Sequence, residues 1–101
     1  MSTSDDRINI VAQFTAKEGS EADLAEAIKA FLPQTLAEEG CERFELNQSR
    51  DNPRVLTIIE RFRDQAAFDS HAEAPYIKDF LDHRVPELVD ETSVIFYKQI
   101  G

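Results

Sequence analysis

Cysteine, glycine and histidine are scarce in this sequence: its 101 residues include one cysteine, three glycines and two histidines. A single cysteine excludes an internal disulfide and a paired-cysteine metal or redox site. Three glycines provide no glycine-rich loop of the kind that holds the phosphates of a nucleotide or flavin. His71 and His83 lack the four-residue spacing of a helical metal-binding pair. We therefore expect no bound metal and no cofactor.

Positive charge is also limited, because 11 basic residues stand against 20 acidic ones and the net charge is −9. Binding to nucleic acid or to an anionic membrane surface requires clustered lysine and arginine, so neither partner is expected. No apolar run approaches the roughly 20 residues of a membrane span. The polar start MSTSDDR does not resemble a signal peptide. These features predict a cytoplasmic protein.

The composition is that of a globular protein, with 42% hydrophobic and 31% charged residues. A chain of this length has room for one core, so we assign residues 1–101 to a single domain, with residues 1–6 as a disordered tail. Such a core is modest, and association into a dimer would add stability.

Four segments have strand character. Ile8–Thr15 alternates apolar and polar residues, and Cys41–Ser49 does so around Phe44 and Leu46. Val55–Phe62 is rich in β-branched residues, and the turn RDNP before it predicts a hairpin with the preceding strand. Ser93–Ile100 is the last predicted strand.

The first helical region has apolar residues at three- and four-residue spacing between Ser20 and Gly40. Ser20 and Asp23 have the spacing of a capping box, which predicts a side-chain cap at Ser20. Pro33 removes a backbone donor, so we expect a kink or short break there. Gly40 predicts the end of this helix.

The second helical region is interrupted by Pro75. Asp64 can cap a short helix that contains His71, and a further helix is expected from about Tyr76 to Val85. The acidic stretch PELVDET, residues 86–92, is predicted to be a loop.

The resulting order, β-α-β-β-α-β, predicts an α+β protein with the ferredoxin-like fold, in which helices cover one face of an antiparallel sheet. Apolar residues occur on both faces of the strands. The uncovered face is therefore expected to meet a second copy of the chain, which predicts a homodimer.

Several segments match a known family: KEGS at Lys17–Ser20, EEGCERFEL at Glu38–Leu46, IIERFRDQAAFDSH at Ile58–His71 and PYIKDF at Pro75–Phe80. On these residues the chain resembles the antibiotic biosynthesis monooxygenase family of dimeric α+β barrel proteins. The resemblance implies a cofactor-independent monooxygenase that acts on a quinol, a phenol or a polycyclic aromatic. Other relatives isomerise a phosphorylated metabolite or degrade heme.

Two positions depart from the family pattern. Tyr76 stands where close relatives often have a second histidine, and Phe62 stands where a tryptophan is common. The chain has no tryptophan at all, which argues against the heme-degrading branch.

His71 is the candidate catalytic residue, because it shares a helix face with Phe68 and histidine can accept a phenolic proton near neutral pH. The alternative is a core histidine that bonds a backbone carbonyl. Tyr76 and Asn9 are candidates to orient substrate oxygens, and a structural tyrosine and an exposed amide are their alternatives. Phe44, Phe68 and Phe80 are candidates for an aromatic pocket lining, although core packing explains them equally well.

Glu60 lies within the apolar strand TIIERF, where an unpaired charge is costly. An ion pair with Arg43 on the neighbouring strand is the favoured interpretation, and a catalytic base is the alternative. Cys41 has no placed histidine partner and is interpreted as a buried or interface thiol.

The function predicted from these features is oxidation of a quinol or phenolic substrate by O2 without a cofactor, with His71 as base. One alternative is an isomerase of a small phosphorylated carbonyl compound, which would need a cationic anchor from Arg43, Arg61 or Lys78. The other alternative is a dimer that binds an aromatic ligand without turnover.

Overall fold

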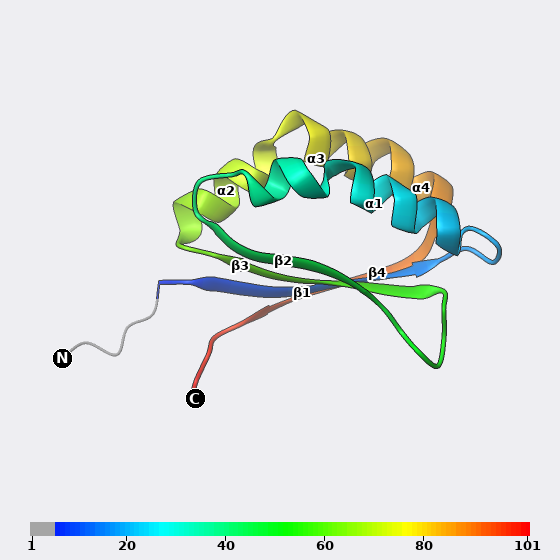
Figure 1. The fold of residues 1–101 in the computed structure, drawn as a ribbon, viewed down its shortest axis with the longest axis horizontal. Coiled ribbons are helices and arrows are strands. Elements are labelled where there is room, and N and C mark those ends of the chain that lie inside the picture. Colours follow the sequence, from blue (N-terminus) through cyan, green and yellow to red (C-terminus); the bar gives the residue numbers. More distant parts are fainter. Residues whose placement is uncertain (1–5) are drawn as a thin grey trace.

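The computed structural model describes residues 6–101, so all of the predicted tail except Asp6 lies outside the described residues. Its helices all lie on one face of a single sheet (Figure 1). The elements are β1 (Ile8–Ala16), α1 (Glu21–Leu36), β2 (Cys41–Gln48), β3 (Val55–Phe62), α2 (Gln65–Glu73), α3 (Pro75–Asp79), η1 (Phe80–Arg84), α4 (Val85–Leu88) and β4 (Val89–Tyr97). The predicted α+β, ferredoxin-like architecture is confirmed.

The sheet has the strand order β2-β3-β1-β4, and every neighbouring pair is antiparallel. Ile10 of β1 lies between Glu60 of β3 and Phe96 of β4, and Phe44 of β2 pairs with Glu60. Because side chains alternate along a strand, this register places all four residues on the helix-covered face. The site residues described below depend on this register.

Helix α1 buries Leu24, Ile28, Phe31 and Thr35 against the sheet. It continues through Pro33, so the expected break does not occur. Phe31 and Thr35 on either side of the proline hold both turns against the core, which offsets the missing N–H. The capping-box prediction is wrong, since Ser20 makes no side-chain cap bond and lacks the extended backbone that a capping residue normally has.

Gly40 does not end α1, which already stops at Leu36. Its φ is +92°, and a Cβ at this position would lie 2.6 Å from the Cβ of Ala67 on α2. The Gly40 carbonyl also accepts a hydrogen bond from the backbone N–H of Arg63 at 2.7 Å. Gly40 therefore lets the turn after α1 pack directly onto the start of α2.

The second helical region starts as predicted, because the Asp64 carboxylate accepts a hydrogen bond from the Ala67 N–H at 2.9 Å. The chain is extended at Ala74 and becomes helical again at Pro75. In η1 the Val85 N–H donates to the Phe80 carbonyl, a wide π-type turn. Pro86 follows without an N–H, so the regular bond to residue 82 cannot form there.

The prediction of a loop for the acidic stretch 86–92 is wrong, because these residues form the end of α4 and the start of β4. Strand β4 begins at Val89 instead of Ser93, because its pairing with β1 extends to Ala16 and overrides the weak strand propensity of acidic residues. Strand β4 lies at the sheet edge.

None of the helices in residues 6–101 is long and apolar enough to cross a membrane.

Candidate active-site cavity

A cavity of about 130 Å³ lies between the sheet and the helical layer. Strands β1 to β4 and the helical segments α1, α2, α3 and η1 all contribute to its wall. Only two lining residues have polar side chains, His71 and Glu60, and the remainder are apolar. Such a space suits a small apolar ligand with few polar groups.

The phenylalanines predicted for the lining, Phe44, Phe68 and Phe80, all reach the wall of this cavity. The Phe80 ring meets Phe14 edge to face, with centroids 5.7 Å apart, and Phe68 meets Phe62 in the same way at 5.8 Å. These packed rings give the cavity fixed aromatic walls.

His71 is 5% exposed and projects from α2 into the core. Its ring lies 4.7 Å from that of Phe62 and 5.6 Å from that of Phe44, measured between centroids. Its Nδ1 lies 3.1 Å from both carboxylate oxygens of Glu38. A carboxylate accepts hydrogen bonds, so Nδ1 carries the proton. In the neutral ring, Nε2 then keeps a free lone pair.

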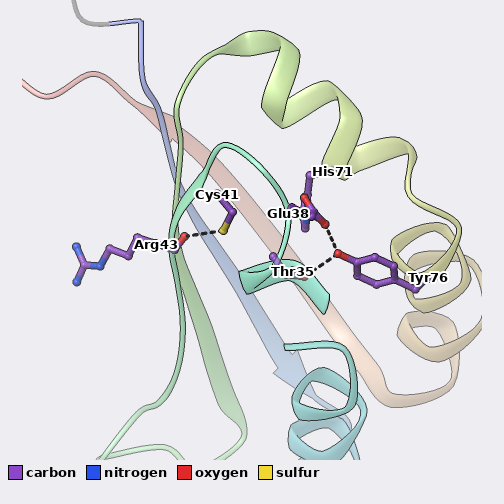
Figure 2. A network of polar contacts seen from close by, with 6 residues as sticks. All are labelled: Thr35, Glu38, Cys41, Arg43, His71 and Tyr76. Carbon is purple, nitrogen blue, oxygen red and sulfur yellow. Dashed lines mark hydrogen bonds and ion pairs between the residues drawn. The ribbon is translucent and has the colours of Figure 1, made fainter. Parts of the chain in front are cut away.

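Glu38 also links His71 to Tyr76 and, through Tyr76, to Thr35 (Figure 2). The Tyr76 hydroxyl donates to Oε2 of Glu38 and lies 3.1 Å from Oγ1 of Thr35, which is fully buried. Burial and the bond to Glu38 raise the pKa of Tyr76 to about 12. Tyr76 therefore stays a neutral donor, and its hydroxyl is directed to Glu38 instead of the cavity.

Glu60 lies on the helix-covered face and is 7% exposed. Within residues 6–101 it makes no hydrogen bond or ion pair. Burial, with a smaller contribution from the negative charge of Glu38, raises the pKa of Glu60 to about 8. The predicted ion pair with Arg43 is wrong: Arg43 binds Glu45 at 2.8 Å. Figure 2 shows Arg43 pointing away from Glu38 and His71, because alternation sends it to the other sheet face.

The structure does not bring Asn9 into the cavity. Asn9 is adjacent to Ile10 on β1, so its side chain points to the uncovered face of the sheet. There its Oδ1 accepts a hydrogen bond from Nε of Arg61 at 2.9 Å. Arg61 also donates to Gln99 at 3.2 Å. Asn9 thus belongs to a polar cluster on the face away from His71.

Cys41 is partly buried near the same network. Its thiol donates a weak hydrogen bond to the Arg43 carbonyl, with 3.8 Å between sulfur and oxygen. Burial and the charge of Glu38 raise the pKa of Cys41 to about 11, so it remains a thiol at neutral pH. A thiol is a poor nucleophile and a poor metal ligand.

Sequence reasoning missed Glu38 and Thr35. Glu38 is 33 residues from His71 along the chain, and no local motif connects them. The only local signal was Gly40, whose need for positive φ could have indicated a tight approach beside Glu38. In the described part of the chain, no group of three or more His, Cys, Asp or Glu residues could hold a metal ion.

Comparison with known proteins supports the same fold. A protein from Shewanella oneidensis, SO0527, is 42% identical, with a TM-score of 0.92 over 95% of this chain and 93% of that one. The structure of Rv0793 from Mycobacterium tuberculosis is 25% identical, with a TM-score of 0.86 over 94% of this chain and 96% of that one.

By sequence, the protein named "Putative monooxygenase Rv0793" is 27% identical over 73 residues, which is 72% of this chain and 71% of the relative. The sequence model of one family, described as antibiotic biosynthesis monooxygenase, matches residues 7–83. This match covers most of the chain. The chain therefore belongs to the antibiotic biosynthesis monooxygenase family.

Proposed function

We propose that this protein is a monooxygenase that oxidises a phenol or quinol with O2 and needs no cofactor. The observation that carries the proposal is the Glu38–His71 pair at the wall of an apolar, aromatic cavity. Glu38 fixes the proton on Nδ1, so Nε2 is available as a base for a phenolic hydroxyl. The family description of monooxygenase activity supports the same class of reaction.

In the proposed reaction, His71 takes the phenolic proton and the resulting phenolate donates electrons to O2. One oxygen atom becomes bonded to a ring carbon, and the other leaves as water with two hydrogens from the substrate. The ring supplies all four electrons, so no external reductant is required. The protein's contribution is to position the ring, remove the proton and exclude water.

The size of the cavity favours a single-ring substrate over a polycyclic one. An engineered cavity of roughly 150 Å³ in another protein holds one benzene molecule. The present cavity, at about 130 Å³, is of similar size. We therefore propose small phenols and hydroquinones as the substrate class.

A homodimer is part of the proposal. Consecutive apolar side chains of the edge strand β4, Val94 to Tyr97, are each about half exposed. Val94 also lines the cavity, so a partner that covers β4 would close the cavity on that side. An exposed apolar edge strand is a liability in a monomer and a common basis for pairing. The proposed compartment of this dimer is the cytoplasm.

The isomerase alternative is less well supported by the cavity. An enzyme that acts on a phosphorylated substrate needs a cationic group for the phosphate. None of the described cavity-lining residues is a lysine or arginine, and Arg61 bonds Asn9 on the opposite face.

The test is oxygen consumption by the purified protein with a panel of single-ring hydroquinones and phenols, measured against autoxidation without protein. We expect uptake that falls to background in His71→Ala. His83→Ala is the matched control, because His83 is exposed and pairs with Asp79 away from the cavity. Absence of oxygen uptake with every substrate would refute the proposed monooxygenase activity and favour a protein that only binds an aromatic ligand. Uptake that persists in His71→Ala would refute the role of His71.

A further inference from the structure

Glu60 is a buried carboxyl group that the pairing of His71 with Glu38 leaves unused. It is 7% exposed, lines the cavity and has no hydrogen-bond or ion-pair partner among residues 6–101. Its neighbours on adjacent strands are the apolar side chains of Ile10 and Phe44. Its carboxyl oxygens are not among the fully enclosed, unpartnered polar atoms of residues 6–101, so they are open to the cavity, where a ligand can supply the partner.

The charges around Glu60 favour its neutral form. Glu38 and Cys41 interact with it electrostatically, and His71 shares the cavity. Arg43 and Arg61 line a hollow on the other face of the sheet that Glu60 also borders, but they bond Glu45 and Asn9 there. No lysine or arginine lines the cavity to stabilise a carboxylate. The pKa of Glu60 is accordingly about 8, so the group is mostly protonated at neutral pH. A neutral carboxylic acid is a hydrogen-bond donor, whereas a carboxylate only accepts.

We propose that Glu60 is a second substrate-contacting residue, which donates its O–H to an oxygen atom of the ligand while Nε2 of His71 accepts the phenolic proton. The two polar residues of the cavity then have opposite roles, one as donor and one as acceptor. The cavity therefore selects single-ring phenols that carry a second, hydrogen-bond-accepting oxygen. The choice of phenols rests on the proposed function, whereas the donor role of Glu60 rests on its burial at the wall of an otherwise apolar cavity.

Matched ligands can isolate this hydrogen bond. A methoxyphenol and the corresponding ethylphenol have nearly the same size and a common hydroxyl, but only the methoxy group has an accepting oxygen. Because the position of that oxygen on the ring is not fixed by the cavity, all three isomer pairs are used. Affinities are measured by calorimetry under argon, so that turnover does not contribute.

Wild-type protein is expected to bind at least one methoxyphenol about tenfold more tightly than its ethyl partner, which corresponds to one hydrogen bond. Glu60→Gln should retain the preference, because its amide still donates. Glu60→Leu should lose it. Above pH 8 the preference should decline in the wild type, as Glu60 ionises, and persist in Glu60→Gln.

Equal affinity within all three pairs, or a preference that survives in Glu60→Leu, would overturn the inference. Infrared spectroscopy gives a second readout that needs no ligand and no stable leucine variant. At pH 7 the wild type should have the carbonyl band of a protonated carboxyl group, and Glu60→Gln should lack it. Absence of this band from the wild type would also overturn the inference.

The inference and the proposed function can fail separately. A preference for methoxyphenol over ethylphenol without oxygen consumption would refute the monooxygenase activity and leave the donor role of Glu60 intact. Oxygen consumption that depends on His71, together with no ligand preference, would refute only the role of Glu60.

Discussion

The carboxylate of Glu38 contacts Nδ1 of His71 through both of its oxygens at 3.1 Å, although 33 residues separate them. Two features of the backbone produce this contact. Gly40 brings the turn after α1 against Ala67, and His71 lies one helical turn beyond Ala67 on the same face of α2. The candidate base is thus oriented by a residue from another segment of the chain.

Glu38→Gln should reduce turnover by about 10- to 100-fold while the protein stays folded. The amide can donate as well as accept, so it no longer requires the proton of His71 to be on Nδ1. Nitrogen NMR of labelled protein reports the tautomer directly, and we expect a mixture in the variant and the Nδ1–H form in the wild type. Identical spectra in the two proteins would contradict the orienting role of Glu38.

Gly40→Ala should destabilise the protein more than Gly19→Ala. Both glycines have positive φ, so both substitutions introduce backbone strain of about 1 kcal/mol or more. Only at Gly40 does the new Cβ meet another atom at 2.6 Å, since nothing lies within 4 Å at Gly19. Urea unfolding measures both free energies. Equal losses would show that the close approach to Ala67 is unimportant.

Glu60 should make stability depend on pH. Its pKa rises from 4.5 in the reference state to about 8 in the folded protein. Between these values the folded protein holds a proton that the unfolded chain has released, so stability falls as pH rises. Glu60→Gln lacks this effect, and its stability relative to the wild type should grow by on the order of 3 kcal/mol between about pH 5 and pH 8.

Urea unfolding at a fixed protein concentration, repeated across that pH range, measures this difference. Glu38, Cys41 and His71 are common to both proteins, so their own titrations largely cancel. Curves that run parallel from pH 5 to pH 8 would argue that Glu60 is ionised in the folded protein.

Ile95→Glu should convert the proposed dimer into a monomer, because it places a charge within the exposed apolar row of β4. Leu36→Glu is the matched control: Leu36 is similarly exposed, at 53% against 48%, but lies at the end of α1. Sedimentation velocity measures the state of each variant. A wild-type monomer, or a dimer that withstands Ile95→Glu, would contradict pairing through β4.

The pattern of alternating and β-branched residues predicted most of the sheet. It identified β3 by its β-branched residues, with the observed bounds, and β1 by its alternation, with one residue missing, because burial on one face imposes a two-residue period. It failed at β4, where the acidic residues before Ser93 have low strand propensity and pairing with β1 determines the start.

The site was only partly predictable. The spacing of Phe68 and His71 on one helix correctly indicated an inward histidine, since such contacts are local. Glu38 depended on a long-range contact that no local pattern encodes. Asn9 and Glu60 lie on neighbouring strands, and only the sheet register determines that Glu60 faces the cavity while Asn9 faces away.

The fate of isotopically labelled oxygen tests the central claim most directly. Protein supplied with labelled O2 and a single-ring hydroquinone should give a hydroxylated quinone with one labelled atom, and the second labelled atom should appear in water. His71→Ala should form no labelled product, whereas His83→Ala should match the wild type. A product without label, or label recovered only as hydrogen peroxide, would contradict monooxygenation.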